Sequence, residues 1–348
     1  MSATLATRTT RPGAKLAWPV LLRLVVLAIV MILSLIVAVR MGAVSMSLAQ
    51  LYDALTGAGD PAMVTIVQQL RVPRALQAAL AGAALAVSGA TFQALLRNPL
   101  AEPYILGVSS GAAAGAVFTV VTGLAVRVVW SLPVAAFIGA IASMLLVFRI
   151  AFSVGRALDT RVLLLAGVVV SAFLVALIWL VLAFADTDSV RSAIFWMMGS
   201  HANASWRSVT ILVVCFVPTF VILLALARPL NLLAIGEPTA AYLGTSVERT
   251  KLIAFGTATL LTAASVSVCG TIGFVGLVVP HAIRILWGSD NRALLPCSAL
   301  LGAAFLVAAD TLSRTIAGAN ELPIGIVTAL VGVPCFVWLL RRPSGGVA

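Results

Sequence analysis

The chain has 348 residues, of which 62% are hydrophobic and only 9% charged, and its mean hydropathy is +1.15. Soluble domains are about half apolar and a quarter charged, so this composition excludes a soluble globular fold. It predicts an all-α polytopic membrane protein. The net charge of +11 mostly reflects membrane topology, and we do not interpret it as a sign of nucleic-acid binding.

Ten mostly apolar stretches follow one another, and most approach the roughly 20 residues that a spanning helix needs. They are residues 18–40, 72–95, 104–126, 131–153, 161–185, 208–227, 250–270, 271–287, 293–313 and 323–340. The first is too long for a cleaved signal peptide, so we expect an uncleaved span. The pair that meets at Gly270 permits a tight hairpin or one broken helix, because several glycines and Pro280 follow.

Lys and Arg predict the orientation, because cytoplasmic loops carry the excess of basic residues. With ten crossings and the N-terminus inside, 15 of the 22 basic residues lie on the inner side and seven on the outer side. The outer seven are Arg40, Arg71, Arg74, Arg127, Arg191, Arg207 and Arg314. We therefore expect a multi-pass protein of the inner (plasma) membrane, with one transmembrane domain at 18–341 and cytoplasmic tails at 1–17 and 342–348.

Three links between spans carry structural signals. A polar link at 97–111 is broken by Pro99 and Pro103, and its Asn, Arg and Glu side chains cannot face lipid. It should lie at a membrane surface or line an aqueous path. The outer loop 42–61 suits a short helix at 48–55 capped by Ser47, and the outer segment 186–206 suits an interfacial helix capped by Ser189.

The largest inner loop, residues 228–251, has the pattern of two short helices separated at Gly236 to Pro238 and ended at Gly244. An amphipathic helical loop on this side should bind a partner in the cytoplasm. The alternative is a helix that only rests on the bilayer.

Several chemical signatures are absent from the sequence. The chain has no G-x-x-x-x-G-K-[ST] phosphate loop, no H-E-x-x-H and no cluster with metal-ligand spacing. We expect no metal or other cofactor, and interpret the four cysteines as free thiols. His281 is isolated, as is His201, although a chelate passing on the outer side makes a ligand role for His201 an alternative.

The motifs of the chain, taken in order, form a set. They are Arg71-Val-Pro-Arg74, Gly82 to Gly89, Gln93, Asn98-Pro-Leu-Ala101, Gly107-Val-Ser-Ser-Gly111, Trp196-Met-Met-Gly199, Gly270 to His281 with Arg284, Ala309-Asp310, Arg314 and Glu321-Leu-Pro-Ile-Gly325. This set resembles the permease subunits of type II ABC importers that take up iron-siderophores, haem or cobalamin, and it covers nearly the whole chain.

The resemblance implies a homodimer of ten-helix subunits, bound by two copies of a separate ATPase and by a periplasmic or surface-anchored substrate-binding protein. Its path would run along the dimer axis. The chain would be a transport subunit rather than an enzyme, carrying a bulky iron chelate (ferric siderophore or haem) or, as the alternative, cobalamin. The resemblance also assigns ATPase coupling to the inner loop, at Leu230, Leu233, Gly236, Glu237, Ala240, Leu243 and Gly244.

By the same resemblance, Arg71, Arg74 and Arg314 dock the binding protein. The alternative for Arg314 is an ion pair with Asp310 one turn away, since a carboxylate inside the membrane needs a partner. The resemblance also implies a cytoplasmic gate at Asn98 and Leu100, with Asp159 and Thr160 as a second candidate gate.

The second gate departs from the family, where small hydroxyl residues can occur at these positions. We assign the paired glycines of the spans to close helix packing. A membrane enzyme, or a proton-coupled secondary transporter using Asp310, is a competing hypothesis. The secondary transporter would leave the helical inner loop without a purpose.

Overall fold

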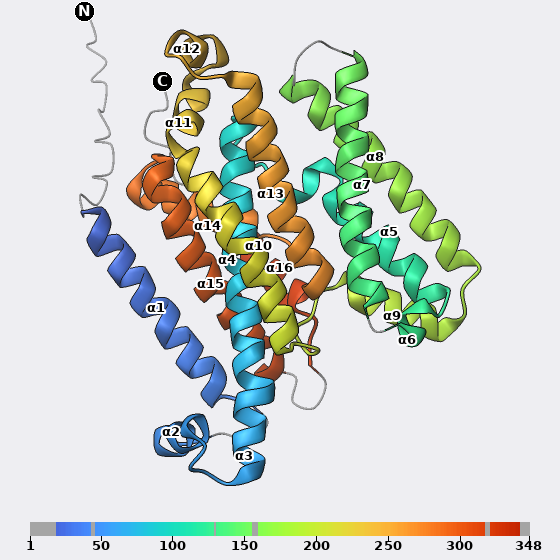
Figure 1. Ribbon diagram of the computed structural model, residues 1–348, viewed down its shortest axis with the longest axis vertical. Helices are drawn as coiled ribbons and strands as arrows, with labels where there is room; N and C mark the ends of the chain where they lie inside the picture. The colour runs from blue at the N-terminus through green and yellow to red at the C-terminus, as the bar shows by residue number, and fades with distance from the viewer. Residues whose placement is uncertain (1–18, 43–45, 129, 155–158, 317–320, 342–348) are drawn as a thin grey trace, which may run out of the picture.

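The computed structural model describes residues 19–42, 46–128, 130–154, 159–316 and 321–341, and within them the chain is helical and contains no strand (Figure 1). The tails predicted at 1–17 and 342–348 lie outside this part. Within the described residues, seven helices are long and apolar enough to cross a membrane, and three shorter apolar helices complete the ten predicted stretches. The prediction of an all-α polytopic fold is confirmed.

The long helices are α1 (Val20–Arg40), the continuous run α3–η1–α4 (Pro61–Leu95), α7 (Ser131–Val154), α8 (Thr160–Ala183), α10 (Trp206–Ala225), α13 (Val247–Cys269) and α15 (Asn291–Ile316). The shorter ones are α5 (Val108–Val121), α14 (Val275–Trp287) and α16 (Ile324–Arg341). The third span is thus shorter than the predicted 104–126, because Gly107 and Gly123, both at positive φ, bound its helix. A 3-10 turn, η2 (Pro103–Leu106), precedes α5, and α6 (Leu124–Arg127) follows it.

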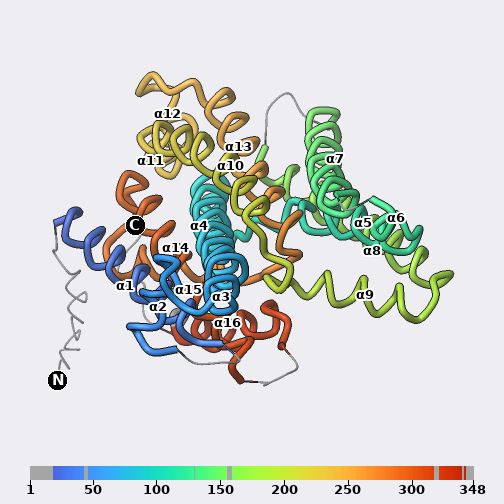
Figure 2. The backbone as a smooth tube through the Cα atoms, turned by 60° about the horizontal axis from the view of Figure 1, so that its bottom comes forward, coloured from blue at the N-terminus to red at the C-terminus, as the bar shows by residue number. Residues whose placement is uncertain are grey.

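The helix α4 (Val72–Leu95) forms the centre of the molecule and packs against α10, α13, α14 and α15 (Figures 1 and 2). Its run of Ala and Gly lets neighbouring backbones approach closely. A Cβ at Gly82 would collide with the Gly302 carbonyl, and one at Gly89 with the Gly276 carbonyl. The packing role predicted for these glycines is confirmed.

The continuous helical run that contains α4 begins at Pro61, eleven residues before the predicted span. Asp60 caps α3 (Pro61–Thr65) by accepting a hydrogen bond from the Ala62 N–H at 3.4 Å, and a π-helical turn, η1 (Ile66–Arg71), joins α3 to α4. Because this turn contains polar residues, the apolar pattern of the sequence did not predict that the span extends through it.

The chain reverses direction at 270–274 in a third way, which is neither a tight hairpin nor one broken helix. Gly270 and Phe274 both have positive φ, +70° and +69°. After the turn, α14 packs on α4, α15 and α16, whereas α13 packs on α4, α7 and α10. The two helices therefore diverge, and the turn between them stays inside the bundle.

The predicted surface helices form. In α2 (Leu48–Thr56), Ser47 makes a capping box with Gln50. In α9 (Thr187–Met197), the predicted Ser189 cap is wrong, because the Asp186 carboxylate accepts the Ser189 N–H at 2.9 Å and places Ser189 inside the first turn. The inner loop contains α11 (Ala227–Ile235) and α12 (Glu237–Tyr242), and Gly236 alone separates them, since Pro238 belongs to the first turn of α12.

Candidate functional site

The pair α11 and α12 projects at one end of the bundle, opposite α2 and α3 (Figure 1). Three of the predicted coupling residues, Leu230, Leu233 and Ala240, are at most 2% exposed and anchor the pair in the core. Leu243 is 61% exposed at the tip. Gly236 and Gly244 have φ of +152° and +83°, values that favour glycine and fix the two turns.

Two further exposed apolar side chains lie at this tip and were not predicted from the sequence. Ile235 is 71% exposed and Tyr242 is 93% exposed, and each ends a short helix beside a glycine turn. With Leu243 they form the exposed tip. Large apolar side chains gathered at a polar end of a membrane protein are typical of a protein-binding surface.

Glu237, the first residue of α12, connects three segments of the chain. It accepts a hydrogen bond from Lys251 Nζ of α13 at 2.8 Å and forms an ion pair with Arg97 Nη2 at 3.4 Å. Arg97 directly precedes the predicted gate residue Asn98. The predicted coupling loop therefore contacts the residue next to the predicted gate residue Asn98.

The link 97–107 runs from this end toward the turn 270–274. Asn98 Oδ1 accepts the Leu100 N–H at 2.9 Å, which makes a local turn, and Leu100 is 43% exposed. Further along, Glu102 accepts the Phe274 N–H at 2.8 Å. Burial raises the pKa of Glu102 above its ordinary value, and this hydrogen bond offsets only part of the rise.

Tyr104 makes the second connection to the turn, donating to the Ile272 carbonyl at 2.8 Å and accepting the Ile272 N–H at 3.0 Å. Gln93, on α4, donates to the Ala101 carbonyl of the link at 3.2 Å and to the Gly276 carbonyl of α14 at 3.1 Å. The link and the turn thus form one hydrogen-bonded unit.

A hollow of about 450 Å³ opens beside the turn 270–274. It is lined by Met197, Met198, Thr271, Gly273, Phe274, Gly325, Ile326, Ala329 and Leu330. These residues come from the end of α9, the turn and the start of α16. The lining is mainly apolar, so the hollow suits the apolar flank of a bulky solute.

The second predicted gate lies at the start of α8. Asp159 is exposed and caps this helix by accepting the Arg161 N–H at 2.7 Å, and Thr160 is its first residue. Residues 155–158, which precede it, lie outside the described part. Among the described residues, no hydrogen bond or ion pair joins Asp159 or Thr160 to Asn98 or Leu100.

The three predicted docking arginines lie at the opposite end, and two of them, Arg74 and Arg314, contact Asp310. Arg74 Nη2 lies 2.9 Å from Asp310 Oδ1, and Arg314 Nε lies 3.3 Å from Asp310 Oδ2. Arg74 Nη1 also lies 2.9 Å from Glu321 Oε1. The ion pair predicted between Arg314 and Asp310 is confirmed, and Arg74 is a second partner from a distant helix.

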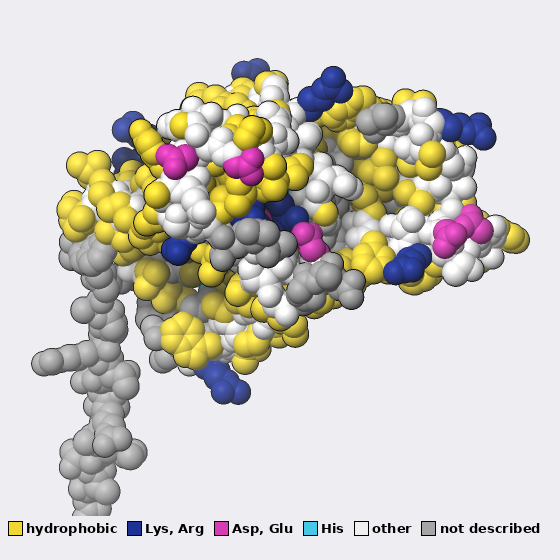
Figure 3. All heavy atoms as spheres, turned by 90° about the horizontal axis from the view of Figure 1, so that it is seen from below, with side chains coloured by type: hydrophobic (Ala, Val, Ile, Leu, Met, Phe, Trp, Pro, Cys, Tyr) yellow, Lys and Arg dark blue, Asp and Glu magenta, His cyan; other side chains and the backbone are white. Residues whose placement is uncertain are grey.

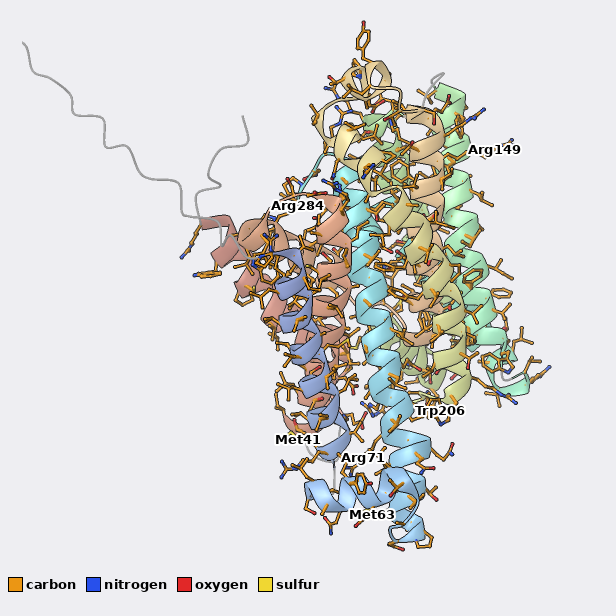
Figure 4. All side chains as sticks on the ribbon, turned by 60° about the vertical axis from the view of Figure 1, so that its left-hand side comes forward. Met41, Met63, Arg71, Arg149, Trp206 and Arg284 are labelled. Atoms are coloured by element: carbon orange, nitrogen blue, oxygen red, sulfur yellow. The ribbon has the colours of Figure 1, made fainter. Side chains whose placement is uncertain are left out.

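Arg71 and Arg314 also hold the C-terminal end of α1. Arg71 Nη1 donates to the Val39 carbonyl at 3.1 Å, and Arg314 Nη2 donates to the Ala38 carbonyl at 2.7 Å. Figure 4 shows Arg71 beside the end of α1 where Met41 lies, and Figure 3 shows Lys and Arg atoms in the middle of this face.

The two histidines have structural surroundings. His201 is 0% exposed, with Nδ1 3.0 Å from Gln77 Nε2, and burial lowers its pKa to about 4. In this conformation it cannot touch a passing chelate. His281 packs near Phe336, with ring centroids 5.9 Å apart. The four cysteines are free thiols, as predicted. Within the described residues, no three His, Cys, Asp or Glu side chains gather as metal ligands.

Comparison with protein families places this geometry in context. Residues 27–342 match the model of the FecCD transport family. The chain belongs to this family. This FecCD permease is 46% identical over 276 residues to the cobalamin import system permease protein BtuC of Halobacterium salinarum, covering 79% of this chain and 73% of that protein.

Two other proteins resemble the FecCD permease over greater lengths. It is 40% identical over 325 residues to the hemin transport system permease protein HmuU of Yersinia pestis, covering 91% of this chain and 94% of that protein. A solved inward-facing structure of a metal-chelate type ABC transporter superposes with a TM-score of 0.84 at 32% identity, covering 92% and 98% of the two chains. The protein is thus a multi-pass permease subunit with the type II ABC importer fold.

Proposed function

We propose that this permease forms a homodimer that conducts a bulky iron chelate, a ferric siderophore or haem, from the periplasm into the cytoplasm. The exposed tip of α11 and α12 carries the proposal, because it offers a binding surface for a separate ATPase while the chain has no phosphate loop of its own. The likeness to a hemin permease and to a metal-chelate transporter supports this cargo class.

Cobalamin is the alternative cargo, favoured by the 46% identity to a permease named for cobalamin import. The lining of the hollow does not select among these solutes, because apolar contacts would suit the flank of each. Selection would then rest mainly with the substrate-binding protein.

The ATPase would move the bundle through residues 228–250. Leu230, Leu233 and Ala240 anchor the lever, Glu237 ties it to α13, and Leu243 and Gly244 lie at its exposed end. The path would pass the gates at Asn98 with Leu100 and at Asp159 with Thr160. This assignment puts the α11–α12 end and both tails in the cytoplasm, and the transmembrane domain, 18–341, in the inner membrane.

Docking of the substrate-binding protein would use the arginine cluster at the other end. Arg74 and Arg314 pair with Asp310 and Glu321, and Arg71 at the same end adds one positive charge, which would attract an acidic partner. Arg74 and Arg314 also neutralise Asp310, so Arg71 is the residue whose reversal tests docking with least damage to the fold. Arg71→Glu should weaken binding of the loaded protein, most at low salt. An affinity equal to wild type would refute this role.

A proton-coupled mechanism fits the structure poorly. Asp310, the candidate proton carrier, is 1% exposed and paired with Arg74 and Arg314. A proton carrier must reach water on each side in turn, and a carboxylate held by two arginines is not placed to do so.

The experiment that names the cargo is uptake by cells that lack the gene and by cells that carry it again. Radiolabelled ferric siderophore, haem and cobalamin would each be offered. A loss confined to one iron chelate supports the proposal, a loss confined to cobalamin supports the alternative, and no loss for any of the three contradicts both.

A further inference from the structure

The carboxylate of Glu237 joins the predicted coupling loop to Arg97, the residue that precedes the predicted gate residue Asn98. We propose that the Arg97–Glu237 ion pair is a releasable contact through which α12 holds the link 97–107, while the Lys251–Glu237 pair keeps α12 attached to α13. The inference rests on the proposed function, since it needs α11 and α12 to be moved by an ATPase.

The two ion pairs of Glu237 differ in burial and in length. Lys251 is 3% exposed and its Nζ lies 2.8 Å from Glu237 Oε1, so this pair is short, and burial of the lysine shields it from the screening that weakens exposed pairs. Arg97 is 41% exposed and 3.4 Å from the same oxygen, and ion pairs of this exposed kind are weak. A movement of α12 should therefore separate Glu237 from Arg97 first.

Arg97 also has an unusual backbone conformation at the point where the link leaves α4. Arg97 has φ of +48°, a left-handed conformation that residues other than Gly, Asn and Asp rarely adopt. It ends α4, where the Asn98 N–H donates to the Gln93 carbonyl at 3.2 Å. The ion pair thus holds the residue that sets the direction in which the link leaves α4.

The residues that follow Arg97 connect it to the hollow, so a movement of Arg97 can be transmitted there. Asn98 and Leu100 follow it at once, and Glu102 and Tyr104 bind the backbone of the turn that lines the hollow. Release of Arg97 would let the gate residues shift while the far part of the link stays tied to the turn. The competing explanation is a surface ion pair with no role in transport.

Variants at Arg97 separate the two explanations in membrane vesicles that contain the permease and its ATPase. The readouts are ATP hydrolysis and uptake of whichever radiolabelled probe the wild-type complex carries: ferric siderophore, haem or cobalamin. Arg97→Gln should reduce uptake per ATP by about two- to fivefold, the range set by the strength of an exposed ion pair. ATP hydrolysis should persist, and Arg97→Lys should restore most of the ratio.

Arg149→Gln is the matched control, because Arg149 is an exposed basic residue of α7 toward the same end of the bundle, apart from Glu237 (Figure 4). Arg97→Gly controls for local stability, since glycine accepts the left-handed conformation. It should be impaired like Arg97→Gln if the ion pair matters. Full recovery in Arg97→Gly, or a wild-type ratio in Arg97→Gln, would overturn the inference.

Failure of the inference can be told from failure of the proposed function. A bulky residue at Gly236, as in Gly236→Trp, should abolish uptake if α11 and α12 transmit the motion of an ATPase. If Gly236→Trp still transports, the proposed function fails. If Gly236→Trp is inactive and Arg97→Gln transports like wild type, only the role of Arg97 fails.

Discussion

Asp310 holds the arginine cluster at the α2–α3 end, and its removal tests how far the fold depends on it. Asp310→Asn would leave Arg314 without a carboxylate and Arg74 with Glu321 alone. Breaking a buried ion pair costs about 3–5 kcal/mol, so we expect a clear fall in the unfolding midpoint of the purified protein.

Asp290→Asn is the control for this experiment. Asp290 pairs with Arg292 at 2.8 Å, but both side chains are about half exposed. Hydrogen bonds from Arg292 lower the pKa of Asp290 to about 2, yet an exposed pair contributes about 1 kcal/mol or less. Equal midpoints for the two variants would contradict a structural role for Asp310.

His201 should make stability depend on pH. Its pKa is lowered to about 4 by burial, against about 6.5 in an unfolded chain. Between these values the unfolded state binds a proton that the folded state does not, so stability falls as the pH drops. From pH 6.5 to 5 the loss should be about 1.6 kcal/mol.

The measurement is the unfolding midpoint at several pH values for wild type and for His201→Gln. Glu102 has a raised pKa and acts in the opposite direction, so the difference between the two proteins isolates His201. Parallel curves for wild type and variant would show that His201 is not buried in its neutral form.

Residue pairs close in sequence were predictable and distant ones were not. Arg314 lies four residues after Asp310, and helical spacing places them together. Arg74 is 236 residues from Asp310, and Arg97 is 140 residues from Glu237, so both contacts depend on how the helices pack. No local pattern encodes such packing.

Helix packing around α4 leads to a prediction with a close control. Gly89→Ala would place a methyl group against the Gly276 carbonyl of α14, which α4 touches directly. Overpacking of this kind costs about 1–3 kcal/mol, so we expect a lower unfolding midpoint.

Gly256→Ala makes the same chemical change in α13, where no atom lies within 4 Å of the new Cβ. Alanine is the better helix former by about 0.5–1 kcal/mol, so this variant should be as stable as wild type or more stable. If both variants behaved alike, the direct contact of α4 with α14 would be wrong.

Elements with a capping or breaking residue were predictable, while elements defined by their surroundings were not. Ser47 and Gly236 mark the starts and breaks of short helices from local chemistry alone. The course of 270–274 depends instead on Glu102 and Tyr104, which hold its backbone from another segment. The sequence therefore left two alternatives open there, and the structure has a third.

The fold of the whole chain could be predicted from the sequence because few backbone structures are stable across a lipid bilayer. Apolar stretches of spanning length must become helices, so the ten elements and their order could be predicted. Two residues of the exposed tip, Ile235 and Tyr242, were not predicted, because large apolar side chains in a sequence look like core residues and only the packed structure shows that they are exposed. Exposure is a property of the assembled bundle.

The central claim is that movement of α11 and α12 by a separate ATPase drives import. Its most direct test is uptake of the labelled probe by vesicles with wild type or Gly236→Trp, with and without ATP and vanadate. We predict that wild-type uptake requires ATP and stops with vanadate, and that Gly236→Trp loses uptake while ATP hydrolysis continues. The account would be contradicted by uptake that is unchanged by vanadate and by Gly236→Trp but is abolished by a protonophore.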